Sequence, residues 1–337
     1  MRILNIHEVD DVRLDAKTPP VAGDRDVVVQ VKACGICGSD LSYIKYGGIM
    51  RKPGGVTPIG HEAAGEVIAV GRDVAGVTIG QRVAINPMNT PSNIGSGGPE
   101  GAFTEQLLVA EARLGDNLLP IPDDVPFEIA AMTEPLSVAL HGVNRGQVKA
   151  GEKVAVFGCG PIGLGMVLWL VDRGAHVVAL DLAPERLARA KALGAHAVIN
   201  PGTEDVRARL IEAHGLGRVL NRDAVGTDVY LDAAGAPNLL DDVVGMAKFQ
   251  SRLVITAAHM KPVQVNLGRM LTTEMTITTA VGYPDEMPVV VAALPRLKDR
   301  IASLISHRLP LGEVLEGLKI AATPQSAKVM IAMEDEA

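Results

Sequence analysis

The sequence has 337 residues, a length that predicts two domains, and its 47% hydrophobic and 21% charged residues are typical of a globular rather than a disordered chain. Three cysteines are too few for a disulfide scaffold or for a four-cysteine zinc site within one chain. The net charge of −7 and the 3% of aromatic residues argue against a nucleic-acid-binding protein.

Short β-strands separated by turn residues are predicted in the first part of the chain. Runs rich in Val and Ile occur at 27–31, 65–70 and 82–85, and Gly and Pro are frequent between them. Short β-branched runs with such punctuation predict an irregular β-rich domain over about the first 140 residues.

From about residue 150 the pattern changes to alternating strands and helices. We predict strands at 153–157, 176–181, 228–232 and 252–255, with helices at 162–173 and 184–193. This alternation is typical of βαβ units and a parallel sheet. It ends near residue 285, after which two helical stretches and a final strand at 328–332 are expected.

A glycine motif lies directly between the strand at 153–157 and the helix that follows it. Gly158, Gly160 and Gly163 fit G-x-G-x-x-G, with Pro161 and Ile162 before the last glycine. In a dinucleotide-binding turn the first glycine makes the turn, the second lets the pyrophosphate approach, and the third lets helix and strand pack closely. The helix N-terminus attracts the phosphates.

An acidic residue at the end of the next strand strengthens this interpretation. Asp181 follows Gly163 by 18 residues, where a carboxylate binds the adenosine ribose hydroxyls and favours NAD over NADP. Arg186 is a nearby basic residue that can moderate this preference. The alternative is a structural glycine turn in another type of α/β protein.

Cys34 and Cys37 form a C-x-x-C motif that permits two interpretations. A redox dithiol is one, although the motif lies in the β-rich part rather than at a thioredoxin-like βα turn. The other is a catalytic zinc site with a single cysteine, whose partners come from the segments around His61 and Glu134.

Four segments in this order resemble the zinc-dependent medium-chain dehydrogenase/reductase family, above all its polyol branch of sorbitol, butanediol and threonine dehydrogenases. They are GICGSD at 35–40, GHEAAG at 60–65, EPLS at 134–137 with His141, and the glycine turn. The resemblance implies an α/β protein. Its GroES-like β-rich catalytic domain would span 1–140 and 281–337, around a Rossmann doubly wound parallel-sheet domain for NAD at 141–280.

The resemblance also implies one catalytic zinc. Cys37, His61 and Glu134 match its ligands, and Glu62 matches the acid that lies beside the metal and can replace water on it. Many family members carry a second, structural zinc held by four cysteines. The corresponding stretch here, 86–101, has no cysteine, so we expect no structural zinc.

Four further residues match positions with a role in the family. Asp40 matches the carboxylate that orients the ligand histidine, Ser39 the hydroxyl that takes the substrate's proton, and Lys328 the basic residue near the cofactor pyrophosphate. Ser42 stands where many members have the histidine of the proton relay. Because serine does not titrate near neutral pH, the proton must leave by another route.

The implied function is a zinc-dependent oxidoreductase that transfers a hydride between a secondary alcohol, diol or polyol and NAD, with zinc polarising the alcohol or carbonyl oxygen. The alternatives are a zinc-independent quinone or alkene reductase of the same superfamily and a non-catalytic NAD-binding protein. The expected partner is a small alcohol or ketone, with no nucleic acid.

An oligomer is expected as well. The β-branched stretch at 276–280 would be an exposed sheet edge, and pairing with a second copy as a homodimer or homotetramer would cover it. No long apolar segment follows the N-terminus, and the apolar run at 161–171 is too short to cross a bilayer. We therefore expect no membrane partner and a cytoplasmic location.

Overall fold

The computed structural model describes residues 1–49 and 55–333 and divides the chain into two compact units. Unit 1 comprises Met1–Pro135 and Asp285–Ala337, and unit 2 comprises Leu136–Pro284. The first boundary predicted from the sequence lies between residues 140 and 141, and the structure divides the units between Pro135 and Leu136. Both positions fall within one continuous helix, Thr133–Arg145 (α3). The last four residues of the predicted catalytic domain, 334–337, lie outside the described residues.

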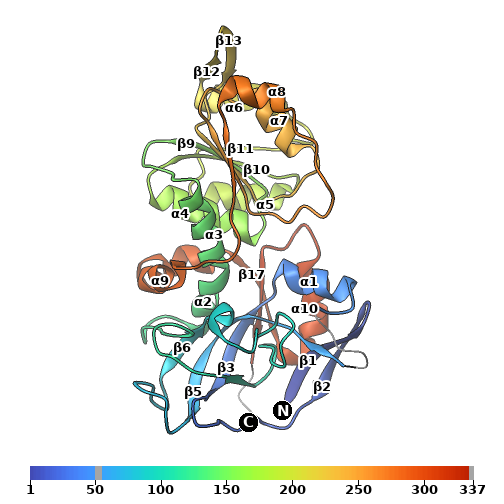
Figure 1. The fold of residues 1–337 in the computed structure, drawn as a ribbon, viewed down its shortest axis with the longest axis vertical. Coiled ribbons are helices and arrows are strands. Elements are labelled where there is room, and N and C mark those ends of the chain that lie inside the picture. Colours follow the sequence, from blue (N-terminus) through green and yellow to red (C-terminus); the bar gives the residue numbers. More distant parts are fainter. Residues whose placement is uncertain (50–54, 334–337) are drawn as a thin grey trace. The chain divides into compact units, whose positions relative to one another are not determined.

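Unit 1 is built mainly from β-strands (Figure 1). Its strands are β1 (Arg2–Glu8), β2 (Asp11–Ala16), β3 (Val27–Gly35), β4 (Thr57–Pro58), β5 (Glu62–Val70), β6 (Arg82–Ile85), β7 (Gln106–Val109), β8 (Leu118–Pro120), β17 (Ile305–Pro310) and β18 (Lys328–Ala332). Its helices are α1 (Gly38–Lys45), α2 (Phe127–Ala131), α9 (Glu286–Ala302) and α10 (Val314–Ala321), with 3-10 turns at Pro87–Asn89 and Leu311–Glu313.

Two sheets organise unit 1. The larger has seven strands in the order β17-β18-β3-β5-β6-β8, with β7 also paired to β3, and the smaller has the order β2-β1-β4. The final strand of the chain pairs with β3, so that Met330 lies opposite Gly35. Because β18 closes a sheet begun by the first hundred residues, unit 1 consists of two separate stretches of sequence.

Unit 2 contains a six-stranded parallel sheet in the order β11-β10-β9-β14-β15-β16. Helices α4 and α5 lie on one side of this sheet, and α6 and α7 on the other (Figure 1). Its elements are β9 (Lys153–Phe157), α4 (Pro161–Asp172), β10 (His176–Leu180), α5 (Pro184–Ala192), β11 (Ala197–Ile199), α6 (Val206–His214), β12 (Leu216–Val219), β13 (Arg222–Val225), β14 (Val229–Asp232), α7 (Leu239–Met246), β15 (Arg252–Ile255), α8 (Leu267–Thr273) and β16 (Thr276–Thr279).

The order of strands in unit 2 confirms the predicted Rossmann architecture. From β9 the chain adds β10 and β11 on one side, then returns to add β14, β15 and β16 on the other. The direction of growth therefore reverses between β9 and β14. In such doubly wound sheets, ligands bind at this reversal, outside the carboxyl ends of the strands.

Three histidine rings pack together at the opposite, amino-terminal edge of this sheet. The rings of His176 and His196 stack with centroids 3.7 Å apart, and the ring of His214 meets that of His176 edge-on at 5.6 Å. The Nδ1 atom of His214 lies 2.7 Å from Thr227 Oγ1, and its Nε2 atom lies 3.2 Å from the His176 carbonyl oxygen. Burial, together with the positive charges of His176 and Lys153, lowers the pKa of His214 to about 4.

This packing predicts a loss of stability in acid. The unfolded chain has a histidine pKa of about 6.5. Between this pH and about 4, His214 is protonated in the unfolded state but remains neutral in the folded state. The free energy of unfolding should therefore fall by about 3 kcal/mol as the pH drops from above 6.5 to 4. Urea unfolding across this range, with wild type and His214→Gln compared, measures the effect. Equal pH slopes for the two proteins would show that His214 contributes nothing.

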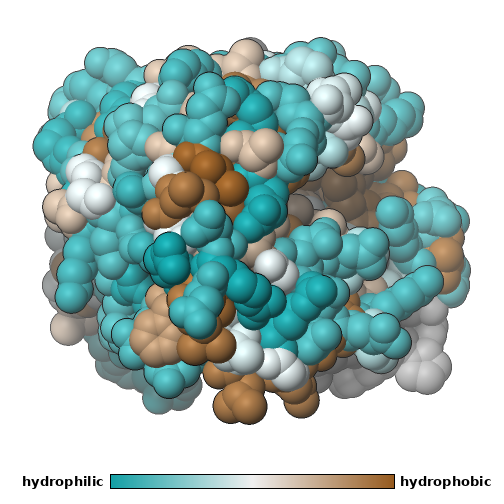
Figure 2. Space-filling view, turned by 90° about the horizontal axis from the view of Figure 1, so that it is seen from above, coloured by the Kyte–Doolittle hydropathy of each residue, from teal (hydrophilic) through white to brown (hydrophobic). Residues whose placement is uncertain are grey.

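The face of the molecule seen in Figure 2 is mainly hydrophilic, with small, separate hydrophobic groups. Within residues 1–49 and 55–333, no helix is both long and apolar enough to span a membrane.

Candidate functional site

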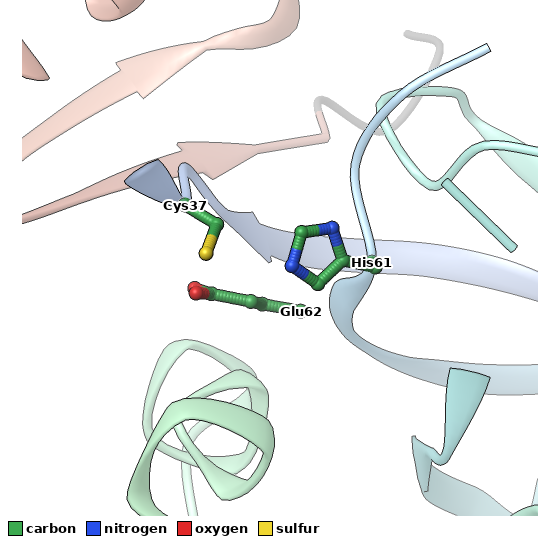
Figure 3. Close-up of side chains that lie close together, drawn as sticks. All are labelled: Cys37, His61 and Glu62. Atoms are coloured by element: carbon green, nitrogen blue, oxygen red, sulfur yellow. The ribbon is translucent and has the colours of Figure 1, made fainter. Parts of the chain in front are cut away.

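Three side chains in unit 1 converge on one point (Figure 3). Ligand atoms of Cys37, His61 and Glu62 all lie within 4.8 Å of one another, and no other such group of three occurs in the described part of the chain. His61 and Glu62 are buried, while Cys37 is half-buried. A sulfur, an imidazole nitrogen and a carboxylate oxygen are the ligand types that zinc prefers in proteins.

The pairing of two strands brings these side chains together. Strand β3 ends at Gly35, which lies opposite Glu62 at the start of β5. A Cβ atom on Gly35 would overlap the Oε2 atom of Glu62, so the glycine makes room for this carboxylate. Two residues after β3, Cys37 precedes the first turn of α1 as its N-cap.

Asp40 connects the two backbone segments that carry the cluster. Its carboxylate is fully buried and accepts hydrogen bonds from the Cys37 N–H at 2.9 Å and the Gly60 N–H at 3.2 Å. The same carboxylate lies 3.5 Å from the Nδ1 atom of His61. Asp40 therefore contacts the segments that carry both Cys37 and His61, an arrangement typical of an outer carboxylate at a metal site.

The surroundings of His61 favour a cation. Burial disfavours a charged ring, but the negative charges of Asp40 and Cys37 outweigh this effect and raise the pKa of His61 well above its ordinary value. The buried Nδ1 atom of His61 faces the Asp40 carboxylate at 3.5 Å. Because a histidine must lose its proton to bind a metal, the negative charges that attract a proton here would equally attract Zn²⁺. The donor set therefore fits zinc.

Lys328 lies at this cluster, bound to Glu62. Its ammonium is 2.5 and 2.6 Å from the two oxygens of the Glu62 carboxylate and 3.0 Å from the Ile36 carbonyl oxygen. The exposed fractions of the two side chains are 1% and 0%. Burial opposes the charge on Lys328, but the negative charges of Glu62, Cys37 and Glu134 raise the pKa of the ammonium above its ordinary value.

The other residues singled out in unit 1 are not part of the group of three. Glu134 is buried in the first turn of α3, outside the group of three, although its charge acts on Lys328. The Oγ atom of Ser39 lies 3.5 Å from His61 Nε2. Ser42 is exposed, and its hydroxyl donates a hydrogen bond to the Gly38 carbonyl oxygen at 3.1 Å.

The glycine turn of unit 2 has the shape that a dinucleotide requires. Gly158 has a φ of 88° and packs against the backbone of Ala233. A Cβ atom on Gly163 would overlap the carbonyl oxygen of Gly158, so only glycine permits this close approach of helix and strand. No atom lies within 4 Å of the Cβ position of Gly160. This open space at the start of α4 fits a pyrophosphate.

Asp181 is fixed beside this turn. Its Oδ2 atom accepts a hydrogen bond from the Cys159 N–H at 2.7 Å, and its Oδ1 atom accepts one from the Ala183 N–H at 2.8 Å. The guanidinium of Arg186 lies 4.0 Å from the carboxylate. The structure thus joins the predicted ribose-binding acid directly to the predicted phosphate-binding turn.

A second acid at the same edge of the sheet was not singled out from the sequence. Asp232 ends β14 and is fully buried, and its Oδ2 atom lies 2.8 Å from Nε2 of His259. Its position at the carboxyl end of a predicted strand was the available signal. The contact with His259, 27 residues further along the chain, has no counterpart in the sequence pattern.

Comparison with known proteins places both units in one family. Residues 23–123 match the family model of the alcohol dehydrogenase GroES-like domain, and residues 161–296 match that of the zinc-binding dehydrogenase. The chain is 31% identical to (R,R)-butanediol dehydrogenase of Bacillus subtilis, with 94% of both chains covered. It is 30% identical to sorbitol dehydrogenase of Rattus norvegicus, with 97% of this chain and 94% of that one covered.

Solved structures of related enzymes have the same fold over nearly all of the chain. The crystal structure of 2R,3R-butanediol dehydrogenase from Bacillus subtilis has a TM-score of 0.86 at 28% identity and covers 98% of this chain and 99% of its own. An alcohol dehydrogenase of Escherichia coli in complex with NADH has a TM-score of 0.83 at 26% identity, with the same shares covered. The chain therefore belongs to the zinc-dependent medium-chain dehydrogenase/reductase family of oxidoreductases.

Proposed function

We propose that the protein transfers a hydride between a secondary alcohol, diol or polyol and NAD, with one zinc ion per chain. The convergence of half-buried Cys37 with buried His61 and Glu62 carries this proposal. The similarity of the chain to a butanediol dehydrogenase and a sorbitol dehydrogenase supports the substrate class.

Cys37, His61 and Glu134 would hold the zinc ion, with Glu62 beside it. Zinc bound there supplies a Lewis acid that lowers the pKa of a bound hydroxyl. The charges of one thiolate and one carboxylate balance those of Zn²⁺. The ammonium of Lys328 neutralises Glu62, so Glu62 adds no further net negative charge to the site.

The substrate's proton would pass first to Ser39, whose hydroxyl lies near His61. Ser42 cannot continue a relay by titration, and its hydroxyl already donates to the Gly38 carbonyl oxygen. We infer that the proton leaves through water or a ribose hydroxyl of the cofactor.

The cofactor site belongs to unit 2. The residues 158–163 would bind the pyrophosphate, and Asp181 the adenosine ribose, with Arg186 nearby. Because the Asp181 carboxylate repels a 2′-phosphate, we infer a preference for NAD over NADP. The related structure with NADH supports a nicotinamide cofactor. Lys328 was expected near the pyrophosphate, and in the structure its ammonium is held by Glu62.

Replacement of Asp181 by alanine tests the cofactor preference. The variant should bind NAD at least about tenfold more weakly, because a charge-assisted hydrogen bond contributes about 1.5–3 kcal/mol. Removal of the negative charge should also improve the relative use of NADP. Steady-state kinetics with both cofactors give the ratio of the two kcat/KM values. An unchanged ratio would mean that Asp181 does not bind the ribose.

The direct test of the function is an NAD-coupled absorbance screen of diols, polyols, amino alcohols and bulky secondary alcohols. We expect turnover within the diols, polyols or secondary alcohols. Zinc-free turnover of quinones or activated alkenes would instead support the alternative reductase activity. Bound zinc and NAD without turnover of any compound would support a non-catalytic protein.

The assembly of the chain is inferred from one sheet edge. Strand β16 ends the six-stranded sheet, and its four residues are exposed or half-buried. An open β-branched edge favours pairing with another strand, so we propose a homodimer or homotetramer formed through this edge. Light scattering should give two or four times the mass of one chain, and the mass of a single chain would contradict the proposal.

A further inference from the structure

The loops after β14 and β15 form one surface beside the glycine turn. Asp232 lies opposite Phe157, the last residue of β9, and opposite Ile255, the last residue of β15. After β15 the chain turns back over Asp232, whose carbonyl oxygen accepts hydrogen bonds from the Thr256 N–H at 2.9 Å and the Ala257 N–H at 3.1 Å. This turn brings His259 onto the Asp232 side chain.

The Asp232 carboxylate is fully occupied by protein donors. Its Oδ1 atom accepts the Ala234 N–H at 2.9 Å and the Gly235 N–H at 2.8 Å, and its Oδ2 atom faces His259 Nε2 at 2.8 Å. The carboxylate is 0% exposed, whereas the His259 side chain is 14% exposed. Asp232 therefore acts on a ligand only through His259.

The hydrogen bond to Asp232 decides which chemistry His259 offers. A carboxylate only accepts hydrogen bonds, so it fixes the proton of a neutral imidazole on Nε2. The Nδ1 atom is then an acceptor, and the one hydrogen bond between the His259 ring and the described residues is made by Nε2. A ligand that donates an O–H or N–H would satisfy it.

The position in the sheet identifies the part of the cofactor that reaches His259. Asp181 directly follows β10, which lies on one side of the reversal point. There it would bind the adenosine ribose. A dinucleotide crosses the reversal point at its pyrophosphate. The other half must therefore lie over β14 and β15, where Asp232 and His259 are found.

We propose that His259, held by Asp232, accepts a hydrogen bond from the nicotinamide-riboside half of the dinucleotide. This proposal rests on the proposed use of NAD. The donor is a hydroxyl of the nicotinamide ribose or the N–H of the carboxamide, since these are the donors of that half. His259 is a binding residue in this proposal, and Asp232 is a positioning residue.

Equilibrium binding of NADH and AMP to the whole chain separates this role from a structural one. His259→Ala should weaken NADH binding about five- to tenfold, the loss of one neutral hydrogen bond. It should leave AMP binding within twofold of wild type, because AMP lacks the nicotinamide riboside. Unchanged NADH binding, or an equal loss for AMP, would overturn the proposal. Failure of the wild-type chain to bind either ligand would instead contradict the use of NAD.

Two further ligands identify the donor. ADP-ribose keeps the second ribose without the ring, and the 3-acetylpyridine analogue of NADH lacks the amide N–H. A ribose donor predicts that His259→Ala weakens ADP-ribose as well as NADH. A carboxamide donor predicts that His259→Ala weakens the binding of NADH but not that of ADP-ribose or of the 3-acetylpyridine analogue.

Asp232→Asn tests the positioning role. Asparagine keeps an oxygen for the Ala234 and Gly235 N–H groups, but it presents an N–H₂ donor to His259. The imidazole proton must then move to Nδ1, so NADH should bind as weakly as to His259→Ala while AMP binds normally. The control is His7→Ala, because His7 forms a pair with Asp15 at the same 2.8 Å in unit 1. Full NADH affinity in Asp232→Asn would overturn the role of Asp232.

Discussion

Replacement of Cys37 by serine is expected to remove bound zinc and to lower turnover by at least about a thousandfold. Zinc as a Lewis acid stabilises the transition state by several kcal/mol, and each 1.36 kcal/mol corresponds to about a factor of ten in rate. Cys37 belongs to the single group of three candidate ligands in the described residues. A hydroxyl is a poor substitute for a thiolate on zinc.

Cys34→Ala is the matched control for this substitution. Cys34 lies on β3, three residues before Cys37, and its side chain is fully buried in the core of unit 1. Burial, together with the negative charges of Asp40 and Glu62, raises its pKa well above the ordinary value of a thiol. We expect this variant to keep its zinc, measured by mass spectrometry of the metal. A zinc-free Cys37→Ser protein with wild-type turnover would refute the role of Cys37.

Replacement of Lys328 by methionine is expected to lower the free energy of unfolding by about 3–5 kcal/mol. The Lys328 and Glu62 side chains are 1% and 0% exposed, so the substitution leaves a buried carboxylate without its counter-charge. The loss of one partner of a buried ion pair has a cost of this size, while removal of both is often neutral. Glu62→Gln combined with Lys328→Met should therefore recover much of the lost stability.

Urea unfolding of the three proteins measures these differences. Lys319→Met serves as the control, because Lys319 pairs with Glu316 on the surface, where the two side chains are 75% and 55% exposed. Such an exposed pair contributes at most about 1 kcal/mol. Equal stability of Lys328→Met and wild type would show that the pair does not stabilise unit 1.

The strands of the parallel sheet were predictable because each is a short, buried apolar run. Predictions at 153–157 and 252–255 agree with β9 and β15. The hairpin of β12 and β13 was missed, since its residues mix polar and apolar side chains without a clear alternation. It closes through Leu220 at a φ of 51°, a conformation for which the usual glycine signal is absent.

The candidate site also contains residues that the sequence predicted and contacts that it did not. The residue types at 37, 61 and 62 indicated a metal centre, and the structure brings their ligand atoms together. The contact of Lys328 with Glu62 depends on the pairing of β18 with β3, between residues almost 300 positions apart in the chain. The pair of Asp232 and His259 depends on a turn after β15. Neither contact follows from local sequence, because tertiary packing decides both.

The central claim is that a nicotinamide-dependent oxidoreductase works here through one zinc ion per chain. It is tested most directly by zinc content and NAD-dependent alcohol oxidation measured on the same sample, before and after chelation. We predict one zinc per chain, loss of turnover when zinc is removed, and recovery when zinc alone is returned. Full turnover by a chain that contains no zinc would contradict the claim.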